Sequence, residues 1–370
     1  MNGIRKKIIV LGMLAVAGCA TFRFSLSEKV DVKMGVPFEL QKRNAVANQP
    51  MYPHLRRLFD GRLVVMSPLG QIISSDNGAT WTPLAERDLA LDPLIDGKDD
   101  VILDRMNNPS PVGGVAVWNI FSVKEGRVTG EKQSAVLRGM PALASNAVML
   151  GTEFLSGMYF WPNERGVMLA DGTILLTAYT RFVEDGKCRT LLIRSRDRGH
   201  SFEYAGTVAT AKDASWGLEG PSESALAVLK DGSLLCVMRV GNELRQAGQM
   251  LLQAQSFDGG NSWTNHHGIS FYGVNPMLAV LENGVIVLGA GRPGNNVIFS
   301  TDNARTWSAE RAVSSPEVKS QGYLDIIPVG PDKVFIVYEL DGTQQQKLWL
   351  WEPPPPQDLV MGVFVEVSPL

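Results

Sequence analysis

The sequence predicts an all-β fold, a six-bladed β-propeller, from three observations: a repeated turn motif, a series of short hairpins, and the lack of any long amphipathic helix pattern. The chain has 370 residues, of which 45% are hydrophobic and 20% charged, as is ordinary for a globular protein with a sizeable core. Its 37 glycines and 21 prolines suit many short strands joined by turns.

The repeated motif is an eight-residue pattern, Ser-x-Asp-x-Gly-x-Ser/Thr-aromatic, at residues 74–81, 195–202, 256–263 and 300–307. The last copy has Ala304 in place of glycine. In such a segment the Asp side chain can accept hydrogen bonds from nearby backbone amides. The glycine supplies a left-handed backbone, and the aromatic residue packs into the core. The pattern therefore predicts four equivalent turns in one repetitive fold.

A second set of turns alternates with the first and consists of Asp-Gly or Asn-Gly pairs between apolar runs, which is a strong hairpin signal. Their positions, with a final Pro-Asp pair, are 60–61, 171–172, 231–232, 283–284 and 331–332. The first interval holds two units, and 115–123 supplies strands for a blade that lacks the eight-residue turn. The count predicts six four-stranded blades. Terminal strands near 30–40 and 360–367 are expected to close the ring.

The N-terminus has the features of an export signal. Three basic residues, 5–7, precede an apolar run at 8–17 that is too short to span a bilayer. The following Val-Ala-Gly-Cys, ending at Cys19, resembles the lipobox of bacterial lipoproteins, in which the cysteine becomes the lipidated N-terminus. The resemblance implies a signal peptide at 1–18, a lipidated linker at 19–45, a propeller at 46–370, and anchoring to the outer membrane. An ordinary signal peptide is the alternative interpretation.

The charge and the metal-binding residue types exclude several functions. The net charge of −3 provides no basic excess to attract nucleic acid. The four histidines and three cysteines have no metal-ligand spacing, so we expect no metal site and no cofactor. A disulfide between Cys188 and Cys236 stays open, because an exported protein meets oxidising conditions.

Functional residues are expected at the open ends of the Asp-Gly hairpins. In a blade, the start of the first strand and the end of the second lie on one face, opposite the eight-residue turns. A carboxylate, a tyrosine and three arginines occupy such positions: Glu223, Tyr323, Arg181, Arg239 and Arg292.

The eight-residue turn resembles the Asp box, or BNR repeat, of sialidases, and four of these five residues match the order of that family's site. The resemblance implies that Tyr323 is the nucleophile, Glu223 its base, and Arg239 and Arg292 the ligands of the substrate carboxylate. Arg181 has no clear counterpart and is a weaker binding candidate. Arginines bind a carboxylate bidentately, and a neutral tyrosine avoids the repulsion that a carboxylate nucleophile would suffer. The implied activity is exo-α-sialidase-like hydrolysis of terminal sialic acid or a related anionic sugar.

Two parts of the family pattern are missing. Met51 occupies the position of a first-blade arginine, and none of the nearby Arg43, Arg56 and Arg57 fits instead. No aspartate for the general acid precedes the first eight-residue turn. Candidates occur in the segment 82–114, which could also be an ordinary solvated loop: Asp92, Asp96, Asp99, Asp100 and Asp104. A non-catalytic glycan-binding propeller and a propeller scaffold without a small ligand therefore remain alternatives.

Overall fold

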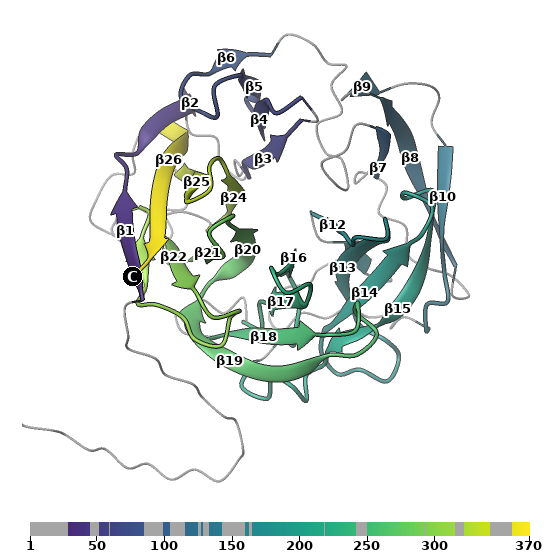
Figure 1. The fold of residues 1–370 in the computed structure, drawn as a ribbon. Coiled ribbons are helices and arrows are strands. Elements are labelled where there is room, and N and C mark those ends of the chain that lie inside the picture. Colours follow the sequence, from purple (N-terminus) through teal and green to yellow (C-terminus); the bar gives the residue numbers. More distant parts are fainter. Residues whose placement is uncertain are drawn as a thin grey trace, which may run out of the picture.

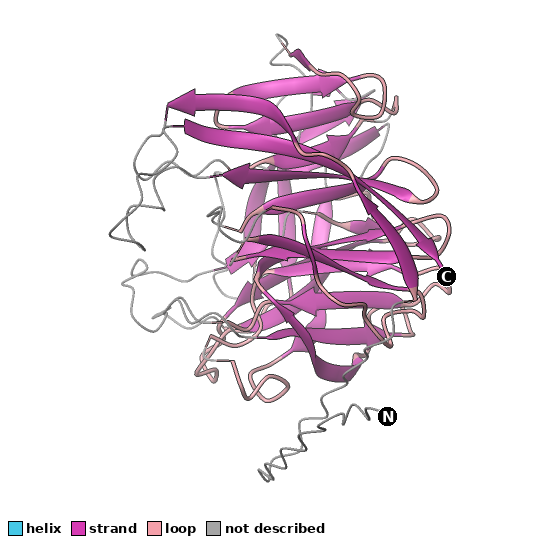
Figure 2. Cartoon of the chain, turned by 90° about the vertical axis from the view of Figure 1, so that its left-hand side faces the viewer, coloured by secondary structure: helices cyan, strands magenta, loops and turns pink. Residues whose placement is uncertain are grey.

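The computed structural model contains five β-sheets arranged in a ring, and strands are the regular secondary structure of its described residues (Figure 1). It describes residues 29–44, 52–58, 60–84, 99–103, 115–124, 127–128, 133–142, 160–162, 165–217, 219–241, 250–292, 294–314, 322–340 and 357–370. Figure 2 shows the same ring from the side, with strands and loops only. Across these ranges, no helix has the length and apolarity needed to cross a membrane.

Three of the sheets are four-stranded antiparallel meanders that proceed outward from the centre of the ring (Figure 1). The first contains β3 (His54–Arg57), β4 (Leu63–Ser67), β5 (Gly70–Ser74) and β6 (Thr82–Pro83). The second contains β16 (Ser224–Val228), β17 (Leu234–Met238), β18 (Met250–Ser256) and β19 (Thr264–Tyr272). The third contains β20 (Val274–Val280), β21 (Ile286–Gly291), β22 (Asn295–Ser300) and β23 (Arg311–Ala312). Middle strands such as β17 are buried on both faces because each sheet packs between two neighbours.

The first described strands and the C-terminal strand meet in a five-stranded sheet that closes the ring. Its strands are β1 (Val30–Met34), β2 (Phe38–Asn44), β24 (Leu324–Pro328), β25 (Lys333–Leu340) and β26 (Gln357–Pro369). Both N-terminal strands pair antiparallel with β26, with Val30 opposite Pro369 and Phe38 opposite Gly362. The prediction that terminal strands close the ring is confirmed.

The prediction of six blades is wrong, because the described residues form five sheets. The fifth sheet has nine strands: β7 (Asp99–Leu103), β8 (Ala116–Lys124), β9 (Arg127–Val128), β10 (Gln133–Arg138), β11 (Phe160–Pro162), β12 (Val167–Met168), β13 (Ile174–Thr180), β14 (Arg189–Ser195) and β15 (Ser201–Ala209). The segment 115–123, expected to start a separate blade, forms most of β8. It joins the next unit because β10 pairs parallel with β15, the outer edge of that unit. An edge strand has unpaired backbone groups, and β10 uses them.

The four eight-residue turns share one hydrogen-bond pattern. In each, the serine hydroxyl accepts the backbone N–H four residues later, at 2.7–3.0 Å. One Asp oxygen accepts the N–H of the Ser or Thr four residues beyond it, at 2.8–2.9 Å. The other Asp oxygen accepts that residue's hydroxyl, at 2.5–2.6 Å. Ala304 adopts the left-handed conformation of the glycines, with φ of 61°.

Several predicted positions lie outside the described residues: Cys19, Met51, Asp92, Asp96 and Asp104. Asp99 and Asp100 begin β7.

Candidate functional site

Glu223 is at the centre of a polar cluster on the face where the hairpins open. It directly precedes β16, and its side chain is 15% exposed. Its Oε1 accepts hydrogen bonds from Arg239 Nη1 at 3.1 Å and from the Tyr323 hydroxyl at 3.3 Å. Its Oε2 accepts the backbone N–H of Asn275 at 2.8 Å. Three sheets therefore supply donors to one carboxylate.

Tyr323 lies directly before β24 and is surrounded by the other members of the cluster. The ring of Tyr52 contacts it edge-on, with 4.3 Å between centroids. The guanidinium carbon of Arg292 is 6.0 Å from the centroid of the Tyr323 ring. The negative charge of Glu223, then burial, raises the pKa of Tyr323 well above its ordinary value, although Arg292 and Arg239 oppose the shift. The phenol of the free protein therefore keeps its proton and donates it to Glu223 in a hydrogen bond.

Arg239 follows the end of β17 and is almost fully buried between two carboxylates. Its Nη2 donates to Glu219 Oε1 at 3.2 Å, while its Nη1 donates to Glu223. Burial alone would lower the pKa of Arg239, but the charges of Glu223 and Glu219 raise it above the ordinary value. Both terminal nitrogens of this guanidinium are thus engaged within the protein.

Arg292 is brought to Tyr323 by an unusually close approach of two backbones. A methyl group on Gly291 would lie 2.3 Å from the Cα of Gly322, and one on Gly322 would lie 2.6 Å from Arg292 N. Gly322 has a φ of +88°, and Arg292 itself has a φ of 65°, which is rare for a residue with a side chain. Glycine at 291 and 322 is therefore a geometric requirement of the Arg292–Tyr323 contact.

Arg181 lies beside the cluster, next to the buried thiol of Cys188. Burial, followed by the charge of Glu219, raises the pKa of that thiol to about 12, and the charges of Arg181 and Arg239 oppose this. The side chain of Arg181 is half-buried. Cys188 and Cys236 are both free and buried, so they do not form a disulfide in this structure.

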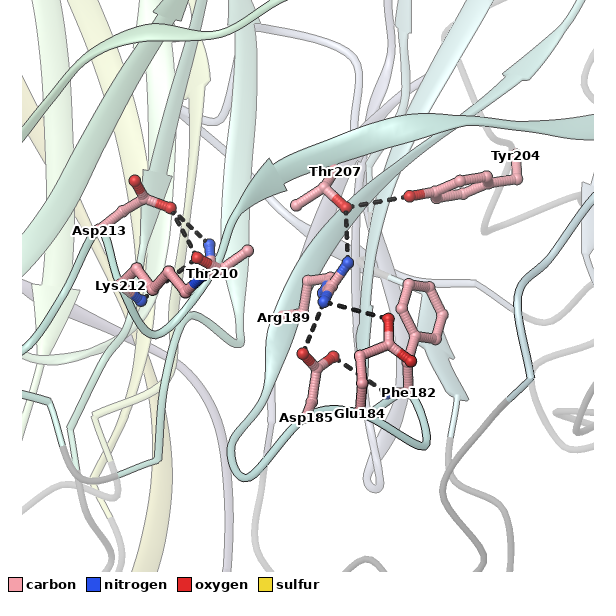
Figure 3. A network of polar contacts seen from close by, with 9 residues as sticks. All are labelled: Phe182, Glu184, Asp185, Arg189, Tyr204, Thr207, Thr210, Lys212 and Asp213. Atoms are coloured by element: carbon pink, nitrogen blue, oxygen red, sulfur yellow. Dashed lines mark hydrogen bonds and ion pairs between the residues drawn. The ribbon is translucent and has the colours of Figure 1, made fainter.

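A polar network fixes the loop that carries Arg181 and Cys188 (Figure 3). Arg189 donates to Asp185 at 2.6 Å, and its guanidinium lies 4.7 Å from the centroid of the Phe182 ring. The loop is also joined to the segment that carries Glu219, because the Cys188 N–H donates to the Glu219 carbonyl at 2.7 Å. These contacts make the loop and the carboxylate partner of Arg239 one connected unit.

Below Tyr323, three segments meet at the buried carboxylate of Asp325. Its Oδ2 accepts the Leu55 N–H at 2.9 Å and Arg56 Nη1 at 2.8 Å. Its Oδ1 accepts Arg165 Nη2 at 3.0 Å and the Ile326 N–H at 2.8 Å. Arg56 is 2% exposed and Asp325 1%. Arg56, one of the nearby arginines that do not fit the position of the missing first-blade arginine, is thus a buried partner of Asp325.

The structure brings together Glu223, Arg239, Arg292 and Tyr323, and it places Arg181 at the edge of the cluster; their catalytic and binding roles stay predictions. Four participants have no role predicted from the sequence: Tyr52, Glu219, Asn275 and Arg165. The acidic pair at 219 and 223, next to one hairpin end, was a usable signal for Glu219. Asn275 contributes only its backbone N–H, which no residue pattern reveals. In the described ranges, no group of three or more His, Cys, Asp or Glu side chains could hold a metal ion.

Comparisons with solved structures support the fold. A protein of unknown function from Dyadobacter fermentans aligns with a TM-score of 0.57 at 17% identity, covering 90% of this chain and 99% of that one. A Hadza microbial sialidase aligns with a TM-score of 0.53 at 15% identity, and the alignment covers 86% of this chain and 65% of that one. A Penicillium chrysogenum α-L-arabinanase aligns with a TM-score of 0.50 at 13% identity, and the alignment covers 90% of this chain and 98% of that one. No protein-family model and no curated protein sequence matches the chain. At these identities the likeness establishes the fold alone: an all-β propeller of the kind found in sialidases and arabinanases.

Proposed function

We propose that the chain is an exo-α-sialidase-like glycoside hydrolase acting on terminal sialic acid or a related anionic sugar. One observation carries the proposal: the Tyr323 hydroxyl donates to Glu223, whose same oxygen also accepts from buried Arg239. A nucleophile hydrogen-bonded to its base, with the base held by a third group, is the general arrangement of covalent catalysis. At 3.3 Å the bond is long, as catalytic hydrogen bonds often are before substrate binds.

In the proposed reaction the phenolic oxygen of Tyr323 attacks the anomeric carbon as its proton passes to Glu223, the glycosidic bond breaks, and the departing alcohol oxygen takes a proton from a general acid. Because the raised pKa keeps the free phenol protonated, this transfer accompanies bond formation instead of preceding it. Arg239 and Asn275 N–H hold Glu223 in place for the transfer. Water then attacks the anomeric carbon and the bond to the Tyr323 oxygen breaks, with Glu223 returning its proton to Tyr323 and the conjugate base of the general acid taking the proton of the water. The segment 82–114 is the proposed source of the general acid.

The substrate carboxylate is assigned first to Arg292. Its guanidinium carbon lies 6.0 Å from the centroid of the Tyr323 ring, which places a positive charge beside the residue whose oxygen would attack the anomeric carbon. Arg239 is engaged by two carboxylates in the free protein, so its binding role requires the substrate to replace one of those bonds. Arg181, at the edge of the cluster, is a further binding candidate.

The test is hydrolysis of a fluorogenic sialoside by residues 20–370, beside Tyr323→Phe and Tyr204→Phe. Tyr204 is a matched control because its hydroxyl also has a partner, Thr207 (Figure 3). It lies on β15 of the nine-stranded sheet, whereas Glu223 precedes β16 of another sheet. We expect turnover by the parent and by the control, and a loss of about 10³-fold or more in Tyr323→Phe. A folded parent that does not cleave sialosides would refute sialic acid as the substrate and direct the assay to other anionic sugars and to glycan binding.

A second candidate is a glycan-binding propeller without hydrolysis. It is favoured by the engagement of both Arg239 terminal nitrogens by Glu219 and Glu223. Calorimetric binding of sialyllactose without turnover, abolished by Arg292→Met, would support this function over the first. For either function we propose that the protein is exported and anchored to the outer membrane through Cys19.

A further inference from the structure

Arg165 connects three sheets of the ring at the level just below Tyr323. It lies two residues before β12, in the nine-stranded sheet. Its Nη2 donates to the Leu55 carbonyl on β3 at 2.9 Å and to Asp325 Oδ1 on β24 at 3.0 Å. Its Nη1 donates to the Ile326 carbonyl at 3.0 Å. In Figure 1, β12, β3 and β24 all lie at the centre of the ring.

These hydrogen bonds join the two segments that carry Tyr52 and Tyr323, the aromatic pair of the site. Asp325 is two residues beyond Tyr323, or about 7 Å along an extended chain. Leu55 is three residues beyond Tyr52, and its N–H and carbonyl both belong to the cluster around Asp325 and Arg165. The relative position of β3 and β24 at this end therefore sets the contact between the Tyr52 and Tyr323 rings.

We infer that Arg165, through Asp325, is a positioning residue that holds Tyr323 in register with Tyr52 and Glu223. The inference deepens the proposed function and rests on it for its catalytic consequence. Arg165 is suited to the task because a planar guanidinium can serve several acceptors in a fixed geometry. It serves three here, one on β3 and two on β24. A lysine at this position would keep the charge but lose the simultaneous bridge.

Arg57 offers a matched control within the same two strands. It lies on β3, and its Nη2 donates to the carbonyl of Pro328, the last residue of β24, at 2.6 Å. It thus also connects β3 to β24, but about 17 Å of extended chain away from Tyr323. Loss of Arg57 removes a hydrogen bond between the two strands but leaves the contacts of Leu55 and Asp325, nearer to the aromatic pair, in place.

The experiment is ¹⁹F NMR of residues 20–370 labelled with 3-fluorotyrosine, comparing Arg165→Met, Arg165→Lys and Arg57→Met with the parent. The chain has seven tyrosines, and phenylalanine variants assign the signals of Tyr52 and Tyr323. In Arg165→Met we expect both signals to shift by more than a linewidth, while the Tyr204 signal stays in place. Arg165→Lys should give a smaller shift, and Arg57→Met should leave both signals at their parent positions.

The inference is overturned if the Tyr52 and Tyr323 signals of Arg165→Met coincide with those of the parent, or if Arg57→Met moves them equally. If Arg165→Met does not fold, Arg165→Lys against Arg57→Lys decides by the same criterion. In a sialoside assay, Arg165→Met should lower kcat about tenfold or more with KM changed less than about threefold. A parent without turnover would refute the proposed sialidase function. The NMR comparison would still decide whether Arg165 positions Tyr323.

Discussion

Replacing Arg239 by methionine should destabilise the protein strongly at neutral pH and less at lower pH. Arg239 is 6% exposed, and its guanidinium nitrogens lie 3.1 and 3.2 Å from oxygens of Glu223 and Glu219. At an effective dielectric constant of 20, two charges about 4 Å apart attract by about 4 kcal/mol, a gain that the loss of hydration partly cancels. Removing one member of such a buried pair costs about 3–5 kcal/mol, because the remaining charge stays buried without its partner.

The expected change in melting temperature follows from the size of the propeller. An unfolding entropy of about 2.1 cal/mol/K per residue over roughly 325 residues gives about 0.7 kcal/mol/K. A loss of 3–5 kcal/mol then lowers Tm by about 4–7 °C at pH 7. Differential scanning calorimetry of parent and Arg239→Met measures it. Arg196→Met is the control, because Arg196 pairs with Glu203 on an exposed surface and should cost at most about 1 kcal/mol.

The pH dependence tests the electrostatic cause. Without Arg239, two carboxylates with little exposure lose the cation that both contact, so burial raises their pKa values in the folded variant above those of the unfolded chain. Each then binds a proton more readily in the folded state, and the variant regains stability as the pH falls through the raised pKa. The Tm deficit should therefore be smaller at pH 5 than at pH 7. A deficit under about 1 °C at pH 7, or one that does not shrink at pH 5, would refute the reasoning.

Three further predictions concern other parts of the molecule. Hydrogen bonds from Thr80 and Ser74 lower the pKa of Asp76 in the folded protein to about 2. The ionised Asp76 side chain therefore stabilises the fold fully above its unfolded pKa near 4, and this stabilisation is lost as the pH falls through 2. Asp76→Asn should show a shallower fall of Tm between about pH 4 and pH 2 than the parent. Gly322→Ala should lower the free energy of unfolding, measured by urea denaturation, by about 2 kcal/mol or more, and by clearly more than Gly232→Ala does. Both glycines have a positive φ, but of the two only a Cβ at residue 322 would meet backbone atoms within 3 Å. A thiol reagent at pH 8 should label neither cysteine of native residues 20–370 and both after unfolding, because burial raises the pKa of both thiols; labelling of the native protein would contradict the burial.

Features set by neighbouring residues were predictable. The eight-residue turns form as expected because their hydrogen bonds join residues at most four positions apart, as between Ser74 and Gly78 and between Asp76 and Thr80. The hairpins at Gly172, Gly232 and Gly284 likewise depend on a local backbone with positive φ. Their regular alternation around the ring was sufficient to bring Glu223, Arg239 and Tyr323 to one face.

Features set by contacts between distant segments were not predictable from local patterns. The number of sheets depends on whether β10 pairs with the edge of β15, and nothing in the sequence of either strand indicates that choice. The engagement of Arg239 by Glu219, the N–H that Asn275 supplies to Glu223, and the bridge from Arg165 to Asp325 all join different sheets or loops. Such contacts are decided by packing around the whole ring, since a side chain's partner depends on which strands surround it and not on its sequence neighbours.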